Sequence, residues 1–153
     1  MSSEVHVSTS RAWKLTAPVI AEDDLQASVA DALDKLLLPP AMWFAMPVGH
    51  IKLTPAQAAR LSRIGVKRGI PDILVLHRRL IGIELKRRGG RLSRTRVVRT
   101  RRGTLRELVG QEEVFPRLQE AGMVIGVCHS SGEVLTFLAA CGVPLRLHGD
   151  VAA

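Results

Sequence analysis

The chain has 153 residues, of which 46% are hydrophobic and 3% aromatic, and its formal net charge is +8. This length and hydrophobic content predict one folded domain with a real core and argue against a disordered chain. The excess of positive charge predicts a polyanionic partner, and nucleic acid is favoured over membrane because no apolar run approaches the ~20 residues of a spanning helix. The absence of a signal-peptide pattern and of paired cysteines favours a cytoplasmic protein.

The first third of the chain predicts an arm, a helix and a strand. Residues 1–19 are polar and irregular, so we expect an N-terminal arm there. A helix is expected over residues 22–37, because leucine and valine recur at helical spacing and Pro39-Pro40 follows. The next predicted element is a strand over residues 42–51.

A short helix and a hairpin follow. Thr54-Pro55 is typical of an N-cap with proline in the first turn, so a helix over residues 56–63 is expected. Two apolar runs then predict two strands, 72–76 and 80–86, that are buried on both faces. Their ends carry ionisable residues, which at the edge of a core need a charged partner or a metal ion.

The ionisable residues of this hairpin are Asp72, Glu84 and Lys86. Because side chains alternate along a strand, Glu84 and Lys86 share one face of the second strand. A two-residue turn would place Asp72 opposite Leu85, on the wrong face, and Arg-Arg does not suit such a turn. We therefore predict a connection of odd length, or a bulge, that brings Asp72 to the face of Glu84.

A run of positive charge accompanies the second strand and continues beyond it. Between Arg78 and Arg106 there are twelve Lys or Arg residues and one acid, Glu84. A run of one sign attached to this strand predicts a phosphate-binding surface, since the planar arginine fork binds phosphate in a bidentate way. The arginines expected to bind nucleic acid are Arg87, Arg88, Arg91, Arg94, Arg96, Arg99, Arg101 and Arg102.

The C-terminal third predicts two helices on either side of a strand. The pattern Thr104-Leu105-Arg106-Glu107 is that of a capping box and predicts a helix that continues to about residue 122. A buried strand over residues 123–128 follows, and a second capping box at Ser130 predicts a helix through Ala140. Together these elements predict an α/β fold with a mixed sheet and helices on its faces.

The hairpin charges suit the hydrolysis of a phosphodiester. That reaction uses a metal ion to neutralise phosphate and to lower the pKa of the attacking water, and magnesium prefers oxygen ligands. Asp72 and Glu84 supply carboxylates, and the backbone carbonyl of Leu85 is well placed to add a third oxygen. The ammonium of Lys86 would orient the water or offset charge in the transition state. A simple salt bridge between Glu84 and Lys86 is the structural alternative.

The combination of motifs resembles the VRR-NUC family of the PD-(D/E)xK nucleases. The resemblance covers about residues 20–140 and rests on Gly69-Ile70-Pro71-Asp72, Glu84-Leu85-Lys86, Gly90-Arg91-Leu92-Ser93, a later Gln111, and Glu22 with Gln26 on the first helix. In one departure from the family pattern, an arginine-rich insertion at about 87–106 separates Ser93 from Gln111.

The resemblance implies a restriction-endonuclease-like fold with a nuclease domain over residues 20–142. We expect residues 143–153 to form a tail. It implies an endonuclease that uses magnesium (Mg2+) or manganese (Mn2+). Stand-alone members of the family resemble structure-specific nucleases, so the resemblance implies cleavage of branched DNA, such as a Holliday junction, by a homodimer.

The resemblance also implies roles for individual residues. Asp72, Glu84 and Lys86 would form the catalytic core. Glu22 would reach in from the first helix to hold the metal or its waters. Gln111 would complete the site, with Gln119 as the alternative on the same helix.

Two other hypotheses remain beside this one. The first is a basic nucleic-acid-binding protein with an inactive site, which would show salt-sensitive binding and no metal-dependent cutting. The second keeps the nuclease and changes its substrate to flap DNA, nicked DNA or RNA. The motifs do not separate these substrates, because substrate shape is recognised by surfaces.

Overall fold

The computed structural model describes residues 22–46 and 51–146. The N-terminal arm expected at residues 1–19 lies outside the described residues. In chain order, the helices and strands are α1 (Glu22–Leu36), β1 (Met42–Ala45), α2 (Pro55–Arg63), β2 (Ile73–His77), β3 (Arg79–Leu85), β4 (Arg96–Arg99), β5 (Leu105–Leu108), α3 (Gln111–Glu120), β6 (Val124–Cys128) and α4 (Ser131–Ala140).

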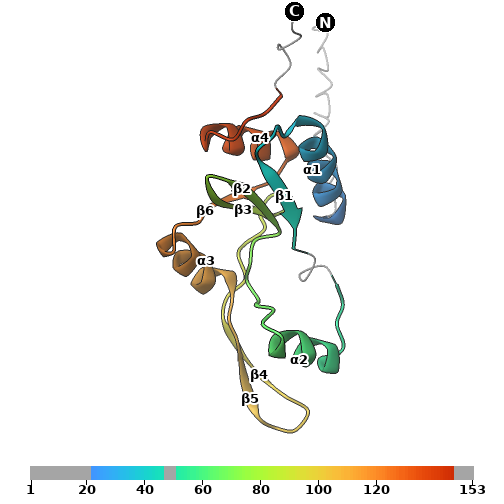
Figure 1. Cartoon of the computed structure of the whole chain (residues 1–153). Coiled ribbons are helices and arrows are strands. Elements are labelled where there is room, and N and C mark those ends of the chain that lie inside the picture. The colour runs from blue at the N-terminus through green and yellow to red at the C-terminus, as the bar shows by residue number, and fades with distance from the viewer. Residues whose placement is uncertain (1–21, 47–50, 147–153) are drawn as a thin grey trace, which may run out of the picture.

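A mixed four-stranded sheet, in the order β1-β2-β3-β6, forms the centre of the fold (Figure 1). β2 runs antiparallel to both β1 and β3, and β6 runs parallel to β3. β4 and β5 pair with each other in a separate two-stranded sheet. The predicted α/β class, a mixed sheet with flanking helices, is confirmed.

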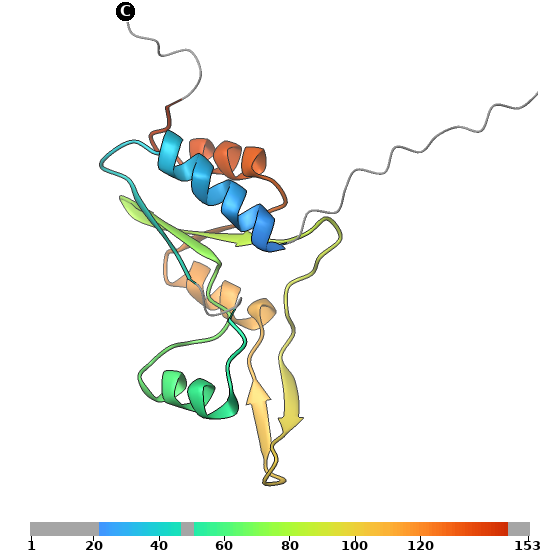
Figure 2. The same cartoon turned by 90° about the vertical axis from the view of Figure 1, so that its right-hand side faces the viewer.

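The core lies between the sheet and one pair of helices. α1 and α4 cover one face of the sheet, and α3 lies on the opposite side (Figures 1 and 2). Val29 and Leu33 of α1 and Leu138 of α4 are fully buried with Ile81 and Ile83 of β3. Since side chains alternate along a strand, the intervening residues of β3 face α3.

Two arms extend from one end of the sheet, away from this core (Figure 2). One arm is α2 with its flanking segments, residues 51–70, which we call the α2 arm; α2 itself has no buried residue. The other arm is the β4–β5 hairpin with its base, residues 93–110, which we call the ribbon. The C-terminal part of the arginine-rich insertion expected at about 87–106 therefore forms a β-hairpin.

The N-caps predicted at Thr54 and Ser130 are confirmed. The capping box predicted at Ser130 is half formed, because the Glu133 side chain accepts from the N–H of His129 and not from that of Ser130. The Thr54 hydroxyl accepts a hydrogen bond from the backbone N–H of Gln57 (3.2 Å), and the Gln57 side chain accepts one from the N–H of Thr54 (2.8 Å). The Ser130 hydroxyl accepts from the N–H of Glu133 (3.1 Å) at the start of α4. In both cases the side chain satisfies a backbone donor that the first turn of a helix leaves without a partner.

The helix predicted to begin at Thr104 is wrong. Residues 105–108 form β5, and α3 begins at Gln111. The Thr104 carbonyl accepts from the N–H of Thr100 (2.8 Å), and the two threonine hydroxyls lie 2.6 Å apart. The turn between β4 and β5 therefore engages the Thr104 hydroxyl, which the capping box would have needed.

The tail predicted over residues 143–153 is also partly wrong. Val143 and Leu145 belong to the buried core, and Leu145 forms a β-bridge with Leu37. The backbone N–H of Arg146 donates to the carbonyl of Leu36 over 2.7 Å. The folded domain thus extends to residue 146, because this segment pairs with the end of α1.

Two smaller differences concern the strands. The strand predicted over 42–51 ends at Ala45, and residues 47–50 lie outside the described part of the chain. Leu76, near the end of β2, is 49% exposed, so burial on both faces holds for the residues nearer the site and not for this end. Among the described residues, no helix is both long and apolar enough to cross a membrane.

Candidate active site

The register of the central hairpin places Asp72 opposite Glu84. β2 and β3 pair from Ile73↔Ile83 to His77↔Arg79, and the single residue between the last pair, Arg78, has a φ of 58°. One step beyond the first pair, Asp72 and Glu84 face each other. The predicted connection of odd length is confirmed.

Asp72 is also tied to the end of β3. Its Oδ2 accepts a hydrogen bond from the backbone N–H of Leu85 over 2.8 Å. Leu85 is the last residue of β3 and is buried. The role predicted for the Leu85 carbonyl as a metal ligand stays a prediction.

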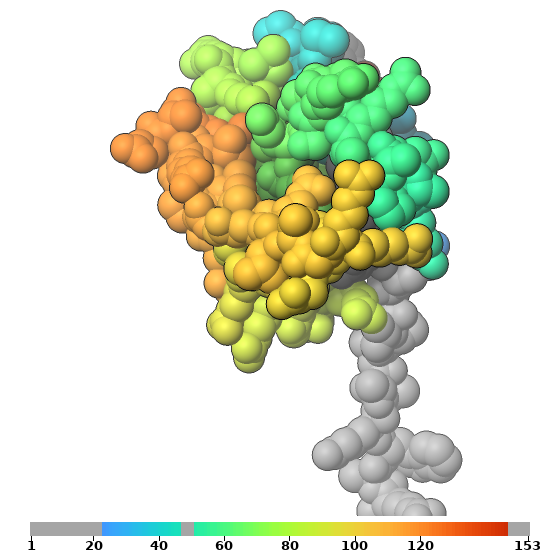
Figure 3. All heavy atoms as spheres, turned by 90° about the horizontal axis from the view of Figure 1, so that it is seen from below, coloured from blue at the N-terminus to red at the C-terminus, as the bar shows by residue number. Residues whose placement is uncertain are grey.

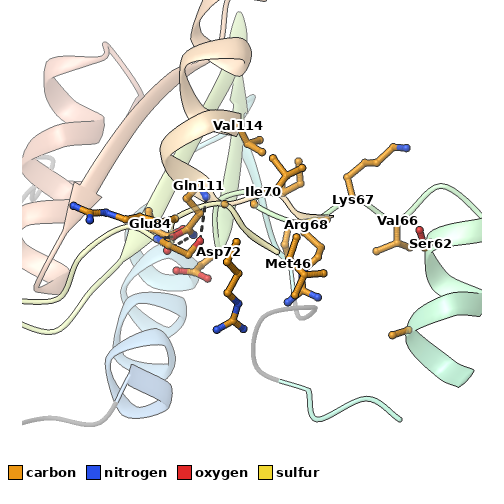
Figure 4. Close-up of a pocket in the computed structure, with 18 of the residues that line it drawn as sticks. Met46, Ser62, Val66, Lys67, Arg68, Ile70, Asp72, Glu84, Gln111 and Val114 are labelled. Carbon is orange, nitrogen blue, oxygen red and sulfur yellow. Dashed lines mark hydrogen bonds between the residues drawn. The ribbon is translucent and has the colours of Figure 1, made fainter. Parts of the chain in front are cut away.

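Glu84 is a buried carboxylate, and both of its hydrogen-bond donors contact the same oxygen. The residue is 0% exposed, and its Oε1 accepts from the Lys86 ammonium (2.6 Å) and from the Gln111 side-chain amide (2.5 Å). Its Oε2 is buried and has no hydrogen-bond partner among the described residues. Figure 4 shows Glu84, Asp72 and Gln111 gathered at one end of the cleft. A buried oxygen of this kind is costly unless a donor or a cation meets it.

The surroundings raise the pKa of Glu84 above its ordinary value. Burial is the main cause, because it disfavours the charged carboxylate, and the negative charge of Asp72 adds to it. The hydrogen bonds from Lys86 and Gln111, and the charge of Lys86, act in the opposite direction. Clustering of two carboxylates therefore has an electrostatic cost that a cation between them would relieve.

Lys86 is held in place from the neighbouring strand. Its backbone N–H donates to the carbonyl of Cys128 (3.0 Å), and its own carbonyl lies 2.9 Å from Nδ1 of His129. The N–H of His129 in turn donates to the side chain of Glu133 (2.8 Å) at the start of α4. No spacing pattern in the sequence links His129 to Lys86, because the two residues are 43 positions apart.

Gln111 joins the site to the base of the ribbon. The N-cap residue of α3 is Gly110, which has no side chain to cap the helix, and Ser93 supplies the cap instead. The Ser93 hydroxyl accepts a hydrogen bond from the N–H of Gln111 (3.0 Å), and the Ser93 carbonyl accepts one from the N–H of Glu112 (3.1 Å). The Ser93 N–H donates to Oε1 of Gln111 (3.1 Å). The two ends of the ribbon, at Ser93 and at the start of α3, are thus hydrogen-bonded to each other. This contact places Gln111, and not Gln119, beside Glu84.

Glu22 is the first residue of α1, and its side chain is outside the described part of the structure. Its predicted role as a metal ligand stays a prediction. The neighbouring turn carries Gln26, whose Oε1 is buried without a hydrogen-bond partner among the described residues. No group of three or more His, Cys, Asp or Glu side chains placed to hold a metal ion occurs among the residues that the structure describes.

The carboxylates lie in a cleft of about 1290 Å³ between the α2 arm, the ribbon and α3. Figure 3 looks into the hollow between the α2 arm (green) and the ribbon (yellow and orange). Asp72, Glu84, Lys86 and Gln111 all line it. The side chains predicted to be functional from distant motifs are therefore brought to one surface. Glu22 is the exception, because its side chain is outside the described part of the structure.

Two of the eight arginines predicted to bind nucleic acid line the cleft. Arg94 and Arg96 line it, and Arg94 also contacts Glu112 over 3.4 Å. The other predicted arginines lie on the exposed surface outside its lining: Arg87, Arg88, Arg91, Arg99, Arg101 and Arg102. The cleft has four further cationic residues that were missing from the predicted set: Lys67, Arg68, Arg106 and Arg117. The Lys67-Arg68 pair directly before Gly69 was a visible signal, whereas Arg117 reaches the cleft only because α3 folds back beside β3.

No protein-family model, curated protein or solved structure matches this chain in the comparisons made.

Proposed function

We propose that the chain is a metal-dependent endonuclease that hydrolyses phosphodiester bonds in DNA. The observation that carries the proposal is the Asp72–Glu84–Lys86 group at the end of a cleft whose charged lining residues are mostly cationic. Paired carboxylates are costly beside each other in a purely structural site, and cations along the approach suit a polyanionic substrate.

The donor set fits magnesium or manganese. Oε2 of Glu84 is a buried oxygen that lacks a hydrogen-bond partner among the described residues, and Asp72 lies opposite Glu84 in the register. Hard divalent cations are held by one or two carboxylates together with water and substrate oxygens, so three protein side chains are not required. When bound, the cation would neutralise phosphate charge and lower the pKa of the attacking water.

The other residues have separate tasks in this proposal. Lys86 places an ammonium next to Glu84, where it would orient water or offset charge on the phosphate. Gln111 holds Oε1 of Glu84 and leaves Oε2 available. Arginines of the cleft would bind the phosphates on either side of the scissile bond. Selection of branched DNA by a homodimer is the finer form of the proposal, and it comes from the family resemblance.

The test is cleavage of a synthetic four-way junction and of a linear duplex, each with magnesium and with EDTA. Asp72→Ala and Lys86→Ala should each lower the rate at least about 100-fold, because each removes a group from the reaction centre. Asp31→Ala with Lys35→Ala is the matched control: it removes an acid and a base that form an exposed salt bridge on α1.

Cutting by Asp72→Ala at the wild-type rate would contradict the catalytic assignment. Salt-sensitive binding by the wild type with no metal-dependent cutting of either substrate would instead support the non-catalytic alternative. A preference for the linear duplex would remove the branched-DNA part of the proposal and leave the nuclease.

A further inference from the structure

The two walls of the cleft differ in chemistry. On the side of the α2 arm, the lining between residues 51 and 66, all of them described, contains no charged side chain. It consists of Ile51, Leu53, Ala58, Leu61, Ser62 and Val66. Because α2 has no buried residue, this apolar face is not part of the protein core. It is an apolar surface open to whatever enters the cleft.

The opposite wall is cationic. The ribbon contributes Arg94, Arg96 and Arg106 to the lining, with Glu107 as the single acid. The register pairs Arg96 with Leu108 and Val98 with Arg106, so Arg96 and Arg106 project from the same face of the ribbon. That face is the one turned to the cleft.

A polymer that fits both walls has an anionic edge and an apolar edge. Duplex DNA presents phosphates and sugars on its outside and keeps the faces of its bases stacked inside, so an apolar wall gains little from it. A single strand exposes the faces of its bases on one side and its phosphates on the other. Lys67 and Arg68 lie between the apolar wall and Asp72, where their side chains would bind phosphates near the site.

We propose that the cleft binds a single strand of nucleic acid, with its phosphates on the ribbon arginines and its bases against the apolar wall of the α2 arm. The proposal rests on the proposed function, because it names the substrate class of that site: nucleic acid with an unpaired segment. The wall is aliphatic, so the contact with bases is independent of sequence.

The test measures binding of the full-length protein in EDTA, so that no cutting is involved. The probes are a fluorescein-labelled oligothymidylate of ~15 nucleotides, within the site sizes of single-strand binders, and a blunt duplex of the same length. The oligothymidylate should bind at least about tenfold more tightly by fluorescence anisotropy, since burial of apolar base surface against the aliphatic wall is worth factors of this size.

Two matched pairs of variants separate the walls. Leu61→Ser, in the apolar wall, should weaken binding of the oligothymidylate about tenfold, because less apolar surface is buried, and should leave duplex binding unchanged. Ile64→Ser is its control, because Ile64 lies on the same arm, is 66% exposed and does not line the cleft.

For the cationic wall, Arg96→Ala with Arg106→Ala should weaken binding of the single strand. The control is Arg60→Ala with Arg63→Ala, which removes the same charge from exposed positions outside the cleft. Circular dichroism melts check that each variant is folded.

Equal binding of duplex and single strand, or equal effects of Leu61→Ser and Ile64→Ser, would overturn the inference. A fall in molecular mass by light scattering for Leu61→Ser alone, with unchanged binding, would also overturn it and assign the apolar wall to a second copy of the chain. Because the assay contains no metal, single-strand binding without any magnesium-dependent cutting would support the inference and contradict the proposed function. Magnesium-dependent cutting without a preference for single strands would support the proposed function and contradict the inference.

Discussion

At the residue scale, Glu84 carries most of the unfavourable electrostatic free energy of the site. Its carboxylate is fully buried, faces Asp72 and receives both of its donors on one oxygen. Burial and Asp72 together raise its pKa, so the folded protein binds a proton at Glu84 more readily than the unfolded chain does. The site is thus expected to reduce stability at neutral pH when no cation is bound.

Glu84→Gln tests this cost. Above the ordinary Glu pKa of 4.5 and up to the raised value, the folded wild type holds more protons than the unfolded chain, so its free energy of unfolding falls as pH rises. Glutamine has the same shape and does not titrate. In EDTA, the melting temperature of the variant minus that of the wild type should therefore grow as the pH rises from 4.5 toward the raised pKa of Glu84.

Differential scanning calorimetry at a series of pH values provides the measurement. Glu120→Gln removes one carboxylate from an exposed position at the end of α3 and is the matched control. A difference between Glu84→Gln and wild type that stays constant with pH would contradict the predicted titration.

At the scale of elements, the decisive feature is the closure between the ribbon and α3. Ser93 caps α3 from 18 residues away, and the Thr95 hydroxyl accepts from the N–H of Gly110 (3.0 Å) and donates to Glu113 (2.9 Å). Gly110 permits this approach because a Cβ there would collide with the backbone of Ser93 and Arg94. The same closure sets the position of Gln111 beside Glu84.

Gly110→Ala should therefore lower the free energy of unfolding by about 1–3 kcal/mol, the usual cost of overpacking. Gly132→Ala is the matched control: it lies in α4, and its Cβ would meet no atom closer than Oγ of Ser130 at 3.9 Å. That substitution should leave stability unchanged or raise it by about 0.5–1 kcal/mol, since alanine suits a helix better than glycine.

Urea unfolding curves give both values. If Gly110→Ala were as stable as Gly132→Ala, the tight contact between the two ends of the ribbon would be ruled out. In the same experiment, a nuclease assay should show Gly110→Ala to be less active than Gly132→Ala, because Gln111 moves with the start of α3.

Elements also show where a local pattern is ambiguous. Thr54, Ser130 and Thr104 all begin capping-box patterns, and only the first two begin helices. At Thr104 the following residues lie opposite Arg96–Arg99, and pairing with that strand replaces the helix. The outcome depends on a partner strand that the local pattern does not contain.

At the scale of the whole molecule, the net charge of +8 and the cations of the cleft predict that binding is driven largely by counterion release. The logarithm of the affinity should fall linearly with the logarithm of salt concentration, by roughly 0.7 per phosphate neutralised on a single strand. Arg96→Ala with Arg106→Ala should reduce this slope by up to about 1.4, because two phosphate contacts are lost.

Anisotropy titrations from about 50 to about 200 mM salt measure the slope. Arg60→Ala with Arg63→Ala should change it less, although the net charge falls equally. A flat salt dependence of the wild type would remove the phosphate-binding role of the ribbon.

The sequence by itself determined the α/β class and the core of the site. Apolar runs and capping residues act over a few positions, so they predicted the central hairpin, α1, α2 and α4. Alternation along a strand, with the unsuitability of Arg-Arg for a two-residue turn, was enough to predict that Asp72 faces Glu84.

Only the tertiary structure decided the contacts between distant segments. Ser93 with Gln111, His129 with Lys86, and Leu145 with Leu37 are pairs that no spacing rule connects. The two walls of the cleft likewise come from segments about 40 residues apart, placed together because both extend from the same end of the sheet. Such contacts depend on how the chain returns through space, and the free energy that selects them comes from burial and pairing across the whole fold rather than from any local pattern.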